Sequence, residues 1–295
     1  MRTAPPARSS EMYTVVVAIA CGILIGLCLG VLGGGGSILT VPVLVSLLGV
    51  GPQSATSASL IIVGITSVIA AVAHARGGHV RWKAAAVFGV IGSLTAFGGS
   101  ILNRAVDPQV LLIAFSALMV VAAVAMLLRT RKSAEPESGP DHDPYAGAEP
   151  VDGSSNSSVA VATATRSRVS TAQAGKLVAA ALVVGFLTGF LGVGGGFLIV
   201  PALVLALGYS MPVAVGTSLV IIAITSAGAF AERLGTASIP WQIVIPFTLA
   251  AIAGSFAGTV IGDRISGNAL TRSFAVLLLA VAVYVATTAG IELAH

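Results

Sequence analysis

Long apolar runs, interrupted by short polar stretches, make up most of this chain. Between Thr14 and Ala73 there is no Asp, Glu, Lys, Arg or His. A helix that crosses the hydrocarbon core of a membrane needs about 20 predominantly apolar residues, so this run alone holds about two to three crossings. The runs also lack the alternation of apolar and polar residues that a membrane β-barrel strand requires. The pattern therefore predicts an all-α polytopic membrane protein.

The apolar segments form two groups, each with four long members and a short one in second place. The first group comprises residues 13–32, 37–48, 55–73, 83–102 and 108–128, and the second comprises 177–191, 197–207, 213–231, 241–261 and 269–289. The stretch between the groups is rich in Pro, Ser, Gly and acidic residues and has too few apolar residues to fold alone. The predicted organisation is an N-terminal tail (1–12), a first transmembrane repeat (13–128), a disordered cytoplasmic linker (129–176), a second transmembrane repeat (177–290) and a C-terminal tail (291–295).

The two groups of segments read as copies of one another. Pro42 and Pro201 are 159 positions apart, and the same offset pairs Trp82 with Trp241 without a gap. Apolar segments share Leu and Val readily, but two tryptophans in register are hard to obtain by chance. Internal duplication with interrupted segments at corresponding positions is typical of secondary transporters. The sequence therefore predicts two duplicated halves with a site near the midplane between them.

The direction of the second half relative to the first depends on the two short segments. If each is re-entrant, each half crosses four times and the halves are parallel; if each completes a crossing, each half crosses five times and the halves are inverted. With the linker in the cytoplasm, the parallel arrangement leaves three of the 15 Lys and Arg residues outside and the inverted arrangement leaves four. The positive-inside rule does not separate such similar numbers. Eight full crossings plus two re-entrant or broken segments is the working prediction.

Glycine clusters interrupt the apolar pattern at corresponding places in both halves. A phosphate-binding loop is disfavoured, because no Lys-Ser/Thr follows the glycines and no acidic ribose partner lies about 20 residues on. Glycines at four-residue spacing allow helices to pack closely in membranes. We assign that role to three sets of glycines, namely Gly22, Gly26 and Gly30; Gly185 and Gly189; and Gly254, Gly258 and Gly262.

The consecutive glycines Gly33–Gly36 and Gly194–Gly196 exceed what close packing requires, so they predict a break in each helix. Non-helical backbone at membrane depth occurs where it is buried or lines a wet cavity. The helix that restarts after each break has unpaired N–H groups and the positive end of its dipole at its N-terminus, which favours an anion. Pro42 and Pro201 are expected to keep the restarted helices bent or broken. Two such ends predict an anion site made largely of backbone amides.

Hydroxyl groups that follow the short segments are candidates to complete this site. A second set, Thr66, Ser67, Thr225 and Ser226, lies two to three turns further on, and hydrogen bonds within the membrane helices explain this set as well as a pathway does. The predicted substrate-binding residues are Gly33, Gly34, Gly35, Gly36, Ser37, Thr56, Ser57, Gly194, Gly195, Gly196, Thr217 and Ser218.

Composition and charge narrow the function further. Only 9% of the residues are charged, whereas soluble globular proteins have roughly 25%. The formal net charge of +4 comes from basic residues at segment ends, which suits membrane orientation rather than nucleic-acid binding. No HExxH motif occurs and the few His lie at loops, so we expect no enzyme activity, cofactor or metal. Proton coupling would have to use His74, Glu232, Asp263 or the substrate's own proton.

The stretch GVGGGFLIVPALVLALG at residues 192–208, followed by AVGTSL at 214–219, resembles the TauE/SafE family of sulfite and organosulfonate exporter-like proteins, also called the four-toluene-sulfonate uptake permease family. The resemblance covers both halves and leaves out the tails and the linker. It implies a multi-pass permease of the bacterial inner membrane, built from duplicated four-helix units, that moves small sulfur-containing anions. The first half departs from the second, because Ser37 replaces the last glycine of the cluster and Ser57-Ala58 stands where Gly216-Thr217 does.

Pattern and resemblance together predict a secondary transporter for a small anion, such as sulfite or an organosulfonate. The expected partners are this anion and the lipid bilayer, not nucleic acid, and a homo-oligomer is left open. Two alternatives stay open: a transporter of another small organic acid, and a membrane assembly protein that transports nothing.

Overall fold

The structure is a computed structural model that describes residues 7–103, 105–132, 171–191, 196–233 and 239–293. Ten α-helices and no strand occur in this part of the chain. Their bounds are α1 Ala7–Leu32, α2 Gly35–Ser46, α3 Pro52–Arg76, α4 Trp82–Asn103, α5 Pro108–Lys132, α6 Thr171–Leu191, α7 Gly196–Leu205, α8 Met211–Ala231, α9 Trp241–Gly262 and α10 Gly267–Leu293.

Eight of these helices are long and apolar enough to cross a membrane, while α2 and α7 have 12 and 10 residues. This confirms the predicted all-α polytopic class with one short helix in each half. Helices α2 and α7 contain Pro42 and Pro201 in their interiors. The predicted linker is helical at both ends, because α5 continues to Lys132 and α6 begins at Thr171. The rest of that linker lies outside the described residues.

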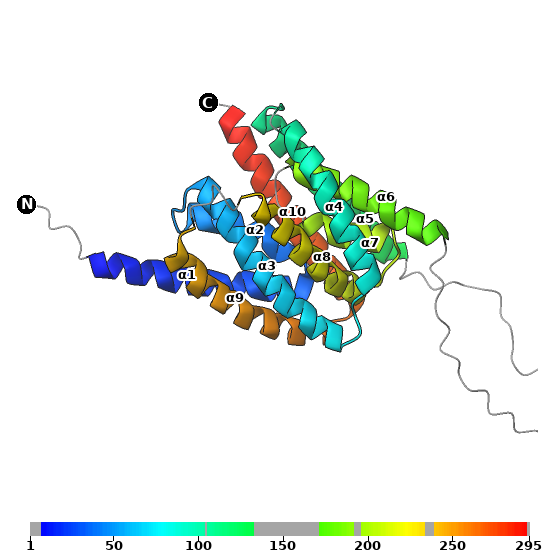
Figure 1. Cartoon of the computed structure of the whole chain (residues 1–295), viewed down its shortest axis with the longest axis horizontal. Helices are drawn as coiled ribbons and strands as arrows, with labels where there is room; N and C mark the ends of the chain where they lie inside the picture. Colours follow the sequence, from blue (N-terminus) through cyan, green and yellow to red (C-terminus); the bar gives the residue numbers. More distant parts are fainter. Residues whose placement is uncertain (1–6, 104, 133–170, 192–195, 234–238, 294–295) are drawn as a thin grey trace, which may run out of the picture.

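The two halves are interlaced, and the most extensive helix contacts join one half to the other. Helix α1 packs along α9, and α6 packs along α4, as Figure 1 shows. Helix α3 also contacts α8, and α5 contacts α10. Large aromatic side chains fill the interior between them; the rings of Phe115 and Phe197, for example, meet edge to face with their centroids 5.1 Å apart. The core therefore belongs to both halves, and neither half forms a separate bundle.

The glycines with four-residue spacing occupy the closest helix contacts, as predicted. A Cβ atom on Gly26 in α1 would overlap the backbone of Ala251 in α9. A Cβ on Gly189 in α6 would likewise overlap the backbone of Ala96 in α4. Small residues at such contacts let two membrane helices approach until their backbones touch. The packing role is therefore confirmed, and both contacts join the two halves.

Contacts along these helices establish the directions in which they run. Gly22 faces the start of α9 at Phe247, and Gly30 faces the later Ser255, so α1 and α9 are parallel. Helices α4 and α6 are parallel by the same reasoning, because Gly92 lies beside Ala181 and Gly99 beside Phe190.

Helices α3 and α8 run in opposite directions. Gly64 in the middle of α3 lies beside Ser226, whereas His74 at the end of α3 lies beside Gly216 at the start of α8. Helix α8 is parallel to α4, because Gly89 contacts Ile224 and the later residue Ser93 lies closest to Gly228. Helices α4, α6 and α8 therefore share one direction.

Helices α1, α3 and α9 share the opposite direction. Ala55 near the start of α3 lies in the same core cluster as Val244 near the start of α9, and His74 at the end of α3 approaches Asp263 just after α9. The corresponding helices α1 and α6 are therefore antiparallel, and so are α4 and α9.

The eight long and two short helices agree with the working prediction, but these directions correct its parallel orientation of the halves, because α1 and α3 can be parallel only if α2 returns the chain between them. Helices α2 and α7, with 12 and 10 residues, thus each reverse the direction of the chain within their half, and the two halves are inverted. The positive-inside rule could not detect the inversion, because the parallel and inverted arrangements differ by only one Lys or Arg residue on the outer side. Helices α4 and α9 begin at Trp82 and Trp241, with the offset of the sequence repeat. Common ancestry of the halves is not tested by these bounds and stays a prediction.

We call the side with the ends of α3, α5 and α9 and the start of α6 the linker face, and the other side the opposite face. Arg129 near the end of α5 donates a hydrogen bond to the carbonyl of Val204 at the end of α7, which places that end at the linker face. The ends of α4 and α8 lie at the opposite face. A pathway through the protein must connect the two faces.

Candidate functional site

Helices α2 and α7, which follow the two glycine clusters, begin side by side where the halves cross. Gly33 has a left-handed backbone (φ +72°), and Gly34 is the N-cap of α2. A Cβ on Gly34 would overlap the carbonyl of Gly196, the first residue of α7. The N-termini of α2 and α7 are therefore neighbours, as a site shared by both halves requires. Gly194 and Gly195 lie outside the described residues.

The glycines of the first break are in close contact with the rest of the protein. Gly34, Gly35 and Gly36 are buried, and a Cβ on Gly36 would lie 2.7 Å from the carbonyl oxygen of Ile25. A Cβ on Gly33 would lie 2.7 Å from the hydroxyl oxygen of Ser218. Close packing accounts for the absence of side chains here. A role for these glycines as anion ligands stays a prediction.

A cavity of about 180 Å³ lies between α4, α6, α7 and α8 and is here called the α4–α8 cavity. It extends from Ile199 and Ile221, near the breaks, to Glu232 and Arg233, just past the end of α8. Arg233 is half-buried and Glu232 is exposed. The polar residues of its wall are Thr56, Ser93, Ser100, Thr188, Thr225, Ser226, Glu232 and Arg233. The cavity thus connects the centre of the protein with the opposite face.

A larger cavity of about 610 Å³ lies between α2, α3, α5 and α10 and is here called the α2–α10 cavity. Its wall is mainly aliphatic, and its few polar groups include Ser37, Ser59 and Tyr284. Thr56, Leu60 and Ser226 line both cavities, so the two spaces adjoin at these residues. Ser37 belongs to the first turn of α2, so the first break reaches the wall of this cavity.

The predicted hydroxyl groups divide into two sets. Ser37 and Thr56 line cavities, although each also bonds a carbonyl of its own segment, that of Gly34 at 2.7 Å for Ser37 and that of Pro52 at 2.8 Å for Thr56. The other three, Ser57, Thr217 and Ser218, are buried and absent from the walls of both cavities.

These three hydroxyls have hydrogen bonds within the protein. Ser57 donates to the carbonyl of Gln53 at 3.1 Å, and Ser218 donates to the carbonyl of Val215 at 2.8 Å. Thr217 accepts a hydrogen bond from the backbone N–H of Arg81 at 3.2 Å. Direct contact with a substrate stays a prediction for this set.

Several cavity-lining residues were missed or left open by sequence reasoning. Thr225 and Ser226 line the α4–α8 cavity, which favours the pathway interpretation of these two. Ser93 and Ser100 on α4 were not predicted at all. The sequence did contain a signal, because Gly92, Ser93, Ala96 and Ser100 recur at helical spacing and form one face of small residues.

Cysteine labelling checks which face of α8 lines the water-accessible path. In a variant without Cys21 and Cys28, Thr225→Cys should react readily with a water-soluble thiol reagent, because Thr225 is a half-buried part of the cavity wall. Ser218→Cys should stay unmodified, because that side chain is fully buried. Equal reaction at both positions, or reaction at Ser218→Cys alone, would contradict the cavity assignment.

Comparison with known proteins places this chain among membrane transporters. A family model described as sulfite exporter TauE/SafE matches residues 18–285. A protein of Xylella fastidiosa named "Probable membrane transporter protein" is 34% identical over 280 residues, covering 93% of this chain and 95% of that protein. The Bacillus subtilis "Probable membrane transporter protein YunE" is 24% identical over 272 residues, covering 89% of this chain and 92% of that protein. No solved structure matches this chain.

Proposed function

This chain belongs to the sulfite exporter TauE/SafE family of membrane transporters, and from that premise we propose that it is a secondary transporter for small anions of the sulfite or organosulfonate type. One observation carries the proposal. The N-termini of α2 and α7 meet beside Ser37, which lines the α2–α10 cavity, and this cavity adjoins the α4–α8 cavity at Thr56 and Ser226.

The chemistry of these cavities suits an anion with a small organic part. The first turn of α2 has the positive end of a helix dipole and N–H groups without intrahelical partners. The half-buried side chain of Arg233 adds a cation to the wall of the α4–α8 cavity. The aliphatic wall of the α2–α10 cavity would hold the carbon atoms of an organosulfonate. Because these groups bind and orient an anion, the proposed activity is translocation without a chemical reaction.

Inverted halves support an alternating-access mechanism. In inverted-repeat transporters, one part moves against the other around a site near the membrane midplane. Because the α4–α8 cavity reaches Glu232 and Arg233 at the opposite face, we propose that this conformation is open on that side. By sequence, the inverted topology leaves all but four of the 15 Lys and Arg residues on the linker face. Because the positive-inside rule favours a cytoplasmic linker face, we propose that this face lies in the cytoplasm and that the membrane is a bacterial inner membrane.

A thermal-shift panel with purified protein, followed by flux measurements in proteoliposomes, tests this proposal. Sulfite, thiosulfate or an organosulfonate should raise the melting temperature in proportion to the logarithm of its concentration above its dissociation constant. The same anion should be exchanged across the membrane. Stabilisation by carboxylates alone would replace the proposed substrate with another organic acid. No stabilisation by any anion together with no flux would leave an assembly role.

A further inference from the structure

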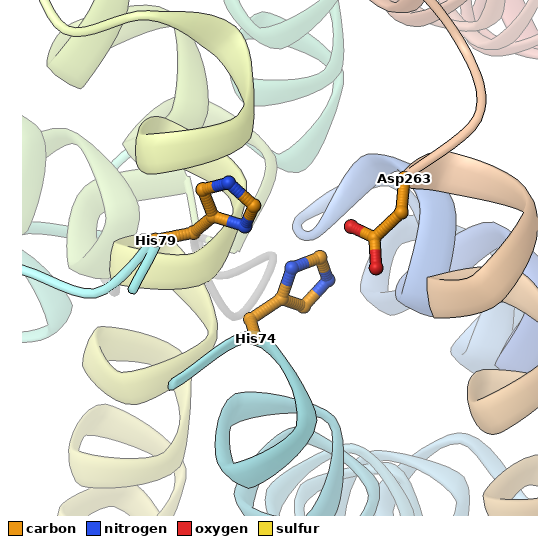
Figure 2. A group of neighbouring side chains, drawn as sticks. All are labelled: His74, His79 and Asp263. Carbon is orange, nitrogen blue, oxygen red and sulfur yellow. The ribbon is translucent and has the colours of Figure 1, made fainter. Parts of the chain in front are cut away.

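His74, His79 and Asp263 form a cluster at the linker face, at the other end of α3 from Thr56. His74 lies in the last turn of α3, His79 in the turn before α4, and Asp263 directly after α9. One potential ligand atom from each side chain lies within 4.8 Å of those of the other two. Figure 2 shows both imidazole rings and the carboxylate pointing into the same space. These three residues also line a cavity of about 130 Å³. From this geometry we propose that the cluster binds a divalent transition-metal ion such as Zn²⁺.

Buried imidazole nitrogens without hydrogen-bond partners support a metal site. His74 is only 4% exposed, and its Nε2 lies 3.1 Å from the carbonyl oxygen of Gly30. A carbonyl can only accept a hydrogen bond, so Nε2 carries a proton, and in the neutral ring Nδ1 then keeps its lone pair. Among the described residues, Nδ1 of His74 and Nδ1 of His79 are buried and have no hydrogen-bond partner. Buried polar atoms of folded proteins are almost always paired, and a metal ion would pair both nitrogens.

The bond to Gly30 is itself typical of a metal-binding histidine. A ligating imidazole usually donates its other N–H to a carbonyl or carboxylate, which orients the ring and selects the tautomer. The two rings of the cluster are not stacked, because their planes differ by 61° and their centroids are 6.4 Å apart. The space between the rings and the carboxylate is therefore available to an ion.

The donor set selects the class of metal. Two imidazole nitrogens and one carboxylate oxygen suit Zn²⁺, Co²⁺ or Ni²⁺, whereas Mg²⁺ and Ca²⁺ prefer oxygen ligands alone. Ligands at about 2.0–2.1 Å from a tetrahedral ion are about 3.4 Å apart. Ligand atoms that lie up to 4.8 Å apart therefore need to approach one another by up to about 1.4 Å. Asp263 is exposed, so its side chain can change rotamer to do so.

The cluster joins the two halves at the linker face, so a bound ion would restrict their relative movement. His74 and His79 belong to the first half, and Asp263 belongs to the second. A bound ion would therefore hold the linker-face ends of α3 and α9 together and resist opening on that side. By the sequence offset, His74 corresponds to Arg233 and Asp263 to Arg104. Arginine does not bind metal ions, so the clamp would act on one face only.

Metal titration of the full-length protein, purified through a tag without histidine and freed of metal by a chelator, tests the binding. Zn²⁺ should bind at one equivalent, and Co²⁺ should give the visible absorption of a nitrogen–oxygen site. His74→Ala, His79→Ala and Asp263→Asn should each weaken Zn²⁺ binding at least about tenfold. His142→Ala is the matched control, because His142 stands between two aspartates in the linker. It should leave the affinity unchanged.

Asp263→Asn keeps the test valid even if loss of the buried His74 impairs folding, because Asp263 is exposed. Unchanged Zn²⁺ affinity in Asp263→Asn and His79→Ala, or loss of binding in His142→Ala alone, would overturn the site. The clamp has a separate readout that needs no substrate. Zn²⁺ should slow backbone hydrogen exchange in residues 74–82 and 262–267 of the wild type but not of Asp263→Asn. Binding without slower exchange would overturn the clamp.

Discussion

Gly34→Ala is expected to abolish transport and to destabilise the folded protein by about 3 kcal/mol, at the upper end of the cost of overpacking. Gly34 has ordinary helical φ and ψ values, so alanine causes no backbone strain there. Its Cβ would instead overlap the carbonyl of Gly196 in the other half. Because the obstacle is backbone rather than a flexible side chain, relief requires the two breaks to separate. The melting temperature and the anion flux in proteoliposomes measure both effects.

The matched control is Gly98→Ala in α4, where no atom lies within 4 Å of an added Cβ. It should be neutral or slightly stabilising, because alanine favours a helix more than glycine does. Alanine at position 34 also keeps its backbone N–H, so the substitution removes no amide donor. A Gly34→Ala protein with native melting temperature and full flux would show that the breaks do not meet as described.

Ser226→Trp is expected to reduce transport to background while leaving the folded protein nearly as stable as the wild type. Ser226 lines both cavities and lies where they adjoin. A tryptophan side chain buries about 150–250 Å², so it would occupy the space through which the anion must pass. The indole ring would enter the two cavities that Ser226 already lines, so we expect little change in the packing of the surrounding helices. Flux in proteoliposomes gives the first effect, and the melting temperature gives the second.

Val121→Trp is the control for this substitution, because Val121 on α5 is 64% exposed and belongs to neither cavity. It should insert, fold and transport like the wild type. Full flux in Ser226→Trp, with the added indole confirmed by fluorescence in excess of that from Trp82 and Trp241, would show that the path does not run between the two cavities.

Sequence reasoning succeeded where the membrane itself imposes the pattern. Apolar runs of about 20 residues identify crossings because each backbone group must be bonded within its own helix in lipid. The four-residue spacing of Gly22, Gly26 and Gly30 predicted a close helix contact, because small residues on one helix face let a second helix approach. It could not identify the partner, since α1 packs on α9 of the other half rather than on a neighbour in sequence.

The candidate site shows the limit most clearly at Thr56 and Ser57. Both are hydroxyl residues next to each other in sequence, and nothing local distinguishes them. Successive residues of an α-helix point about 100° apart. Thr56 therefore lines both cavities, whereas Ser57 is buried and bonded to its own helix. The orientation of α3 about its own axis determines which of the two hydroxyls lines the cavities, and contacts with the other half fix that orientation.

By itself, the sequence determined that this is a helical membrane protein with two similar halves and a broken helix in each, because these properties depend on local composition and spacing. Only the tertiary structure decided that the halves are inverted, that α2 and α7 begin side by side, and that His74 approaches Asp263. Each of these depends on which helix faces lie together, and residues far apart in the chain make those contacts. A pattern along one chain does not contain the rotations and partners that the three-dimensional packing selects.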